Sequence, residues 1–388
     1  MKTSTDRILT THVGSLPRPQ EVVDFLFAQD RGEPYDAAKF DAALGRAVTD
    51  RVGRQCEAGI DVVSDGEMSK ISYATYIRHR LTGFEAGDVP RATPADLDDF
   101  PEYRDRIAAI GATPKYLRPI CKGPIGVKDV EPLNRDIARF KDALAHANVV
   151  DAFMTAVSPG TIAMFQPNEY YPSHQAYLEA LAGAMRTEYE TIVESGVLLQ
   201  VDCPDLAFGR HVNFRNADED EFLRNAAIQV EALNDALAAV PADRVRLHVC
   251  WGNYEGPHHR DIPLAKVLPI LFRAKPMALL IEGANPRHEH EWEIWKTHTL
   301  PDDKILVPGV LDSSCNFIEH PELVEQRIVR YADLVGRDRV IAGTDCGFGT
   351  FAGFGAVHPS ICWAKMRSLA EGAQLATMKL WGPAMAAV

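Results

Sequence analysis

The sequence predicts an α/β protein whose parallel strands close into a (β/α)8 TIM barrel. Two observations predict this fold: short apolar runs alternate with long amphipathic stretches, and eight such runs occur along the chain. The runs are Ile8–Val13, Ile60–Ser64, Phe153–Val157, Val197–Val201, Val245–Cys250, Ala278–Glu282, Ile305–Val310 and Val340–Gly343. A doubly wound open sheet is the competing architecture. Neither GxGxxG nor GxxxxGKS/T follows the first run, so the nucleotide-binding versions of that fold have no support.

Capping residues mark the ends of the helices expected between these runs. Ser173 is a candidate N-cap and Gly196 a candidate C′ residue, which predicts a helix between them. A second helix is expected from Pro321 to Gly336, since proline is favoured in a first turn. A third is expected from about Asp36 to Ala58.

The chain has 388 residues, more than the roughly 250 of a typical barrel. We place the surplus mainly at about 85–126, an acidic segment that contains several prolines, where the run LRPICKGPIG is a candidate for an extra hairpin. No repeat, low-complexity tract or linker interrupts the remainder. We therefore expect one elaborated domain over residues 1–388.

Composition excludes some classes of partner. There are 41 basic and 54 acidic residues, a formal net charge of −13, which disfavours nucleic acid and anionic membranes. No run reaches the roughly 18 apolar residues of a membrane span, and the N-terminus lacks the apolar core of a signal peptide. We expect a cytoplasmic protein that acts on small molecules.

The seven cysteines are scattered and odd in number. In the reducing cytosol this argues against a disulfide framework and for buried thiols, metal ligands or a catalytic thiol. We interpret Cys56, Cys121 and Cys362 as packing thiols, and Cys315 is ambiguous.

Polar residues directly follow most of the predicted strands. In a barrel these strand ends converge on one face, where active sites are built. The residues concerned include Ser15, Glu67, Asp202, Cys203, His248, Cys250, Glu282, Asp312 and Cys346.

A metal site is the most specific interpretation of these strand ends. His248 and Cys250 lie two residues apart on one strand, so their side chains point the same way. Glu282 and Cys346 end two later strands, and one His, two Cys and one Glu suit Zn²⁺ best. The alternative is that these cysteines only fill the core, because cysteine is among the most buried residue types. Cys203 is a further candidate ligand.

Eight short motifs then resemble, in order, the catalytic barrel of cobalamin-independent methionine synthases. They are TTHVGSLPRP, VVSDGE, SYATYIRHRLTGF, QVDCPD, HVC, LLIEGAN, VPGVLD and GTDCGF, spread from about Thr10 to Thr350. The chain is too short for the duplicated, two-barrel enzyme and resembles the single-barrel members. The related epoxyalkane:coenzyme M transferases share that size and zinc chemistry.

The resemblance implies a zinc-dependent thiol alkyltransferase. It assigns the zinc ligands to His248, Cys250, Glu282 and Cys346. It also implies that four residues hold the amino-acid part of homocysteine, namely Gly14, Ser15, Glu67 and Asp202. The competing interpretation of Glu67 and Asp202 is helix capping or a solvated loop.

The departures from the family pattern concern the folate-specific parts. The family's DEP is Asp202-Cys203-Pro204 here, and its DIHS is Asp312-Ser313-Ser314-Cys315, without the histidine thought to protonate the leaving group. The segment TIAMFQPNEYY lacks the tryptophan expected against a pteridine ring. Another acid is then needed. Its candidates are His12, Tyr73, Tyr76 and His211, to which Asp312 is added as a catalytic candidate.

These residues predict that a small-molecule thiol, activated by Zn²⁺, attacks a methyl group or another electrophilic carbon. The alternatives are thiol opening of an epoxide, a zinc hydrolase or decarboxylase in the same barrel, and a non-catalytic zinc protein. A local basic pocket for a carboxylate or sulfonate is a further hypothesis, from Arg18, Lys70, Arg78, Arg80 and Arg210. The apolar tail, residues 370–388, makes a homodimer a further expectation.

Overall fold

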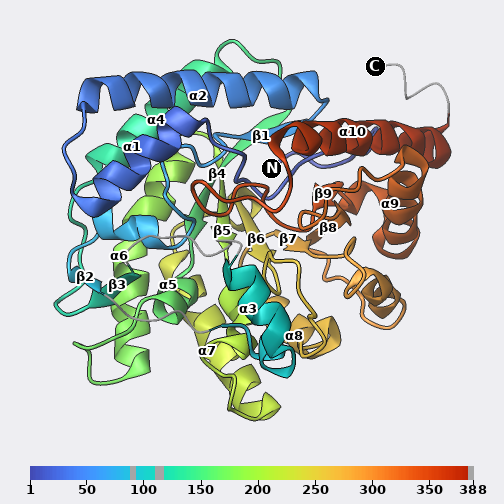
Figure 1. The fold of residues 1–388 in the computed structure, drawn as a ribbon. Helices are drawn as coiled ribbons and strands as arrows, with labels where there is room; N and C mark the ends of the chain where they lie inside the picture. Colours follow the sequence, from blue (N-terminus) through green and yellow to red (C-terminus); the bar gives the residue numbers. More distant parts are fainter. Residues whose placement is uncertain (88–92, 110–117, 383–388) are drawn as a thin grey trace.

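A parallel sheet of seven strands forms the centre of the computed structural model, which describes residues 1–87, 93–109 and 118–382 (Figure 1). Neighbouring strands follow the order β1-β4-β5-β6-β7-β8-β9, and every pair is parallel. The strands are β1 (Val62–Ser64), β4 (Asp151–Val157), β5 (Leu198–Asp202), β6 (Val245–Val249), β7 (Ala278–Ile281), β8 (Ile305–Leu311) and β9 (Gly343–Thr344).

The N-terminal segment closes this sheet into a barrel. Thr10 forms a parallel bridge with Ala342 beside β9, and Thr11 forms one with Val62 in β1. The Ala342 N–H donates to the Leu9 carbonyl at 2.8 Å, and the Val62 N–H donates to the Thr10 carbonyl at 3.0 Å. All eight predicted runs therefore lie in the barrel, and the predicted fold is confirmed.

Helices surround the strands (Figure 1). Most strands lead into one or two helices, but β7 leads into the 3-10 turns Glu289–Lys296. The α-helices are α1 (Gln20–Arg31), α2 (Ala37–Glu57), α3 (Pro101–Ala109), α4 (Glu131–Leu144), α5 (Pro159–Phe165), α6 (His174–Glu194), α7 (Glu219–Ala236), α8 (Leu264–Leu271), α9 (Pro321–Val335) and α10 (Pro359–Trp381).

The three predicted helices lie where the capping residues place them. The Ser173 hydroxyl accepts the Ala176 N–H at 3.1 Å and caps α6. The Asp36 carboxylate caps α2 in the same way, and Gly336 follows the end of α9. Side chains that accept these otherwise unpaired N–H groups set the start of each helix.

Strand β6 shows how the barrel sorts its side chains. Val245, Leu247 and Val249 belong to the apolar core that the helices share. Arg246 points the other way, where its guanidinium carbon lies 3.8 Å from the centre of the Phe153 ring. Because strand side chains alternate, His248 lies on the inner face with Arg246.

The chain between β1 and α4 adds structure outside the barrel. Strand β2 (Phe84–Gly87) pairs antiparallel with β3 (Arg118–Cys121), so the described part of the run expected to form a hairpin pairs instead with an earlier segment. A 3-10 helix, η2 (Ala95–Asp99), precedes α3. The extension of the chain expected at about 85–126 is therefore partly described, with residues 88–92 and 110–117 outside the described residues.

The apolar C-terminal segment is largely used within the chain itself. Residues 370–381 belong to α10, which packs against α9 and α2 and buries Ala373, Ala376 and Thr377. Residues 383–388 lie outside the described residues. In the described part of the chain, no helix has the length and apolarity needed to cross a membrane.

Replacing Asp61 by alanine is expected to destabilise the closure of the barrel. The Asp61 carboxylate accepts the Thr10 N–H at 2.8 Å, and it pairs with the Arg7 guanidinium at 2.6 Å. Loss of bonds to a partly buried charged group lowers the free energy of unfolding by about 2 kcal/mol. Thermal unfolding measures the effect, with the exposed neighbour Asp6→Ala as the control. An unchanged midpoint in Asp61→Ala would contradict this role for the carboxylate.

Candidate metal and substrate site

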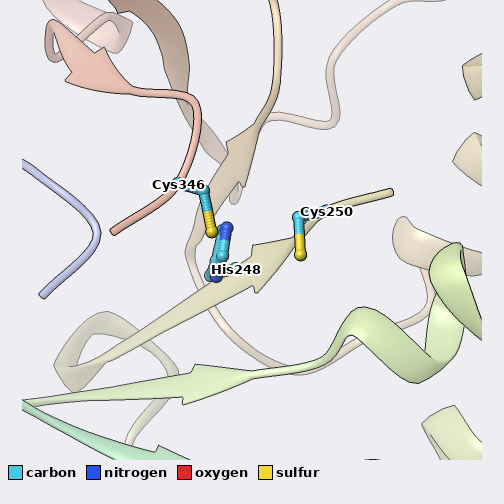
Figure 2. Close-up of side chains that lie close together, drawn as sticks. All are labelled: His248, Cys250 and Cys346. Atoms are coloured by element: carbon cyan, nitrogen blue, oxygen red, sulfur yellow. The ribbon is translucent and has the colours of Figure 1, made fainter. Parts of the chain in front are cut away.

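A histidine and two cysteines meet at the carboxyl end of the barrel strands (Figure 2). His248 lies in β6, Cys250 directly follows that strand, and Cys346 follows β9. One ligand atom from each residue lies within 4.8 Å of the others, and all three residues are buried. These side chains come from strand ends nearly 100 residues apart in the chain. Closure of the barrel brings them together.

The His248 ring is oriented as a metal ligand requires. Its Nδ1 lies 3.2 Å from the Asp202 carboxylate, while its buried Nε2 has no hydrogen-bond partner among the described residues. A buried polar atom without a partner is costly. A carboxylate on one ring nitrogen with the other nitrogen left open is the usual arrangement of a histidine that binds a metal.

The two thiols are linked by a hydrogen bond. This bond lowers the pKa of Cys250 to about 7 and raises the pKa of Cys346 well above its ordinary value. Burial opposes charge on His248, but the hydrogen bond to Asp202 outweighs it and the pKa of the imidazole rises to about 9. Two soft sulfur donors and an imidazole nitrogen within reach of one another fit a divalent metal.

Glu282 lies beside this trio but is not part of it. The Trp251 N–H donates to one Glu282 oxygen at 2.9 Å, and the Asn285 amide donates to the other at 2.8 Å. Burial, together with the neighbouring Cys250, raises the pKa of Glu282 to about 8. The predicted fourth ligand is thus held by hydrogen bonds next to the other three.

The predicted substrate residues border the same space. Ser15, Glu67 and Asp202 line a cavity together with the His/Cys/Cys trio. Burial raises the pKa of Glu67 to about 7, and Asp202 adds to the effect. Glu67 accepts the Thr155 hydroxyl at 2.9 Å through Oε1, while its buried Oε2 accepts no hydrogen bond from the described residues. We call these six residues the floor of the cavity.

Gly14 positions the floor without lining the cavity. Its φ of +137° is a conformation that side-chain-bearing residues rarely adopt. A Cβ there would come within 2.5 Å of the methyl group of Thr155, whose hydroxyl donates to Glu67. A glycine is therefore required at this turn.

Two of the three predicted catalytic residues lie outside the described cavity lining. His12 is fully buried, with Nε2 2.7 Å from the Gln55 amide oxygen and Nδ1 accepting the Gly14 N–H at 3.1 Å. Burial lowers the pKa of His12 to about 4. The Asp312 carboxylate accepts the N–H and hydroxyl of Ser314, each at 2.7 Å. Tyr73 does line the cavity, next to Phe165 and Phe351.

The remaining candidates have structural partners. Tyr76 donates to Glu188 at 2.6 Å, and the His211 ring lies 2.6 Å from Asp261. The Cys203 thiol donates to the Val201 carbonyl and is not in the trio. The other four cysteines, Cys56, Cys121, Cys315 and Cys362, are also outside it.

The predicted basic pocket does not form at the floor. Lys70 donates to Thr155 at 2.6 Å, Arg80 pairs with Asp136 and Glu188, and Arg18 donates to the Glu67 carbonyl. Arg78 pairs with Asp30, and Arg210 donates to the Phe214 carbonyl. None of these five basic residues is among the described lining of the cavity.

Sequence reasoning missed the upper part of the cavity. The cavity has a volume of about 420 Å³, and apolar and aromatic side chains dominate the lining above the floor. Three of these, Leu97, Tyr103 and Ile107, come from the added segment between β2 and β3, within residues 93–108, which we call the roof. Its acidic, proline-containing sequence gave no apolar periodicity that could have revealed this role.

A buried cluster of histidines behind the trio was also missed. His211, His258 and His288 all contact the Asp261 carboxylate, at 2.6, 2.9 and 2.9 Å. The His288 ring packs 4.4 Å from the ring of Trp251, and the backbone N–H of Trp251 donates to Glu282. The only signal in the sequence was the run GPHHRD, which has no metal-ligand spacing.

Comparisons with known proteins identify the family and the fold of the chain. The catalytic-domain family of cobalamin-independent synthases matches residues 109–361. A methionine synthase of Saccharolobus solfataricus is 26% identical over 374 residues, which is 96% of this chain and 95% of the relative. One from Sulfurisphaera tokodaii is 25% identical over 339 residues, 87% and 85% of the two chains. Among solved structures, a B12-independent methionine synthase from a Shewanella species, in complex with selenomethionine, has a similar fold, with a TM-score of 0.72. Its sequence is 18% identical, and the match covers 97% of this chain and all of that one.

Replacing Cys250 by serine is expected to abolish metal binding. The substitution removes one of two thiol donors from a three-residue group, and a hydroxyl is a poor ligand for a borderline-soft metal. Elemental analysis of the purified protein should find about one metal ion per chain before the change and almost none after it. Cys56→Ser, a thiol outside the trio, is the matched control. A Cys250→Ser protein that retains a full equivalent would exclude the site.

Proposed function

The chain belongs to the family of cobalamin-independent synthase catalytic domains, and from this premise we propose that it transfers a methyl or related alkyl group to the sulfur of a small thiol. The curated relatives are named methionine synthase, which favours homocysteine as that thiol. The observation that carries the proposal is the buried His/Cys/Cys trio at the floor of the cavity, with His248 Nε2 left without a partner among the described residues.

Zn²⁺ is the metal that this donor set suits best. His248, Cys250 and Cys346 would hold it, and Glu282 is the candidate for a further ligand that the substrate sulfur displaces. When bound, Zn²⁺ would lower the pKa of the substrate thiol and so make the sulfur nucleophilic at neutral pH. The protein contributes the orientation of His248 through Asp202 and a site that excludes water.

The rest of the floor is suited to an amino acid. Glu67 and Asp202 offer carboxylates to an ammonium group. The Oε2 of Glu67 accepts no hydrogen bond from the described residues, although the Arg18 guanidinium lies 3.8 Å from it. Ser15 would hold the substrate carboxylate, and Gly14 would shape the turn that places Ser15 on the floor. These contacts orient the sulfur toward the trio.

The reaction needs one proton removed and one supplied. The thiol first loses its S–H proton. The S–C bond then forms as the bond between that carbon and the leaving group breaks. The leaving group keeps the electron pair of the broken bond and takes up a proton. Of the three residues proposed for this chemistry, Tyr73 alone is among the described cavity lining. We therefore propose Tyr73 as the proton donor in place of His12 and Asp312.

Incubation of the metal-loaded protein with homocysteine tests the function. We expect loss of free thiol and a product whose mass has increased by the alkyl group, with a folate methyl donor or a small epoxide as the second substrate. Release of acid without loss of thiol would instead indicate a hydrolase or decarboxylase. A thiol that reacts with nothing and leaves the metal coordination unchanged would indicate a non-catalytic metal protein.

The pH dependence of homocysteine use is expected to follow Glu67. The pKa of Glu67 is raised to about 7, so its carboxylate is charged above that pH and neutral below it. Between pH 8 and pH 6 the charged fraction falls about tenfold, and kcat/KM for homocysteine should fall with it. In Glu67→Gln this component of the pH profile should disappear.

The control is 4-sulfanylbutanoate, which is homocysteine without its amino group. It has the same thiol and carboxylate, so any pH effect that comes from the sulfur alone will appear with it too. An equal fall for both thiols would show that Glu67 does not bind the ammonium group.

A further inference from the structure

The roof is attached to the barrel by its aspartates. Asp96 accepts the Tyr254 hydroxyl at 2.7 Å and the His258 N–H at 2.8 Å. Asp98 pairs with Arg215, and Asp99 accepts the Arg260 guanidinium at 2.7 Å. These contacts hold Leu97, Tyr103 and Ile107 over the floor of the cavity as a fixed wall.

The polar groups in the upper lining are occupied by the protein itself. The Tyr103 hydroxyl donates to the Glu255 carbonyl, and the Arg118 guanidinium donates to the Phe165 carbonyl. The Asn253 amide donates to the Gly347 carbonyl and the Thr350 hydroxyl, while its oxygen accepts the Ser313 hydroxyl. A ligand that lies against this wall therefore meets few open donors or acceptors.

The unsatisfied polar atoms lie at the other end of the cavity. Among the described lining residues, the buried side-chain polar atoms without a partner are Glu67 Oε2 and His248 Nε2, and both belong to the floor. Three charged residues belong to the described upper lining. Glu255 is exposed, and Arg104 pairs with Asp105 at 3.3 Å with 37% of its side chain exposed. Arg118 is partly buried, and its guanidinium donates to the Phe165 and Met164 carbonyls. The cavity is thus divided into a polar floor and an apolar wall.

We propose that the second substrate, the alkyl donor, is an uncharged molecule with an apolar body, held between the roof and the aromatic side chains Phe165, Phe208 and Phe351. Leu97, Tyr103 and Ile107 determine its specificity. A charged donor buried against this wall would lose its hydration, and the two guanidiniums in the described lining, those of Arg104 and Arg118, already have protein partners. This inference rests on the proposed alkyl transfer to a thiol, whose polar substrate would occupy the floor.

Transfer from such a donor balances without another reactant. The S–C bond forms as the C–O bond of an ether or epoxide breaks, and the oxygen leaves with the electron pair. That oxygen then takes up one proton. An uncharged donor therefore needs an acid at the wall, and Tyr73 lies among the residues that line it.

Binding of two matched probes to the metal-loaded protein tests the inference. The probes are 4-methylanisole, which is neutral, and 4-methoxybenzoate, which has a carboxylate in place of the methyl group. Ligand-observed NMR titration in the presence of homocysteine, which would occupy the floor, gives both dissociation constants. We expect the neutral probe to bind at least about tenfold more tightly, a difference of about 1.4 kcal/mol.

Ile107→Gln places an amide on the wall and should weaken binding of 4-methylanisole about tenfold. Arg106→Gln, the same new residue at the exposed preceding position of α3, should leave it unchanged. Three outcomes would each overturn the inference. They are equal effects of the two substitutions, binding of 4-methoxybenzoate that is equal to or tighter than that of 4-methylanisole, and no binding of 4-methylanisole.

The binding experiment and the alkyl-transfer assay fail independently. If the neutral probe binds at Ile107 but no thiol is consumed with any donor, the proposed function fails and the apolar site remains. If homocysteine is alkylated only by an anionic donor, the function holds and the apolar-donor inference is wrong.

Discussion

Closure of the parallel sheet by residues 9–11 is the constraint on which the site depends. The segment supplies one bridge to each edge strand, which brings the end of β9 round to the ends of β1 and β5. Cys346 can then lie against His248 and Cys250, although β9 is three strands away from β6 along the open order of the sheet. The same closure places Ser15, four residues after Thr11, on the floor of the cavity.

Convergence of strand ends has an electrostatic cost. Glu67, Asp202, Glu282 and the two thiols are all buried within one small region, and burial raises the pKa of Glu67 and of Glu282. Such a group of acids is stable only if cations or protons balance it. The protein supplies Arg18 at the back of Glu67, 3.8 Å away, and the histidine cluster around Asp261 behind Glu282. The remaining excess of negative charge, at the sulfur atoms, is where a divalent metal would be most stabilised.

The barrel could be predicted from the sequence because it follows from local rules, whereas the residues of its floor are predicted from their strand-end positions together with the family resemblance. Period-two alternation determines that His248 and Cys250 point the same way, and capping chemistry determines where α2, α6 and α9 begin or end. The role of His12 could not be predicted this way. It ends the first strand as an active-site residue would, but Gln55, a residue of α2, binds its Nε2 and turns the ring away from the cavity. Asp312 likewise follows a strand, and only its contacts show that it caps the turn at Ser314.

The roof explains why the donor is the harder substrate to infer. Residues of the floor lie at strand ends, where the barrel geometry limits which side chains can meet. Leu97, Tyr103 and Ile107 lie in a segment that the barrel does not need, attached by three aspartates to loops. Its side chains can change without disturbing the strands or the trio. Family membership therefore constrains the chemistry at sulfur more closely than it constrains the molecule from which the alkyl group comes.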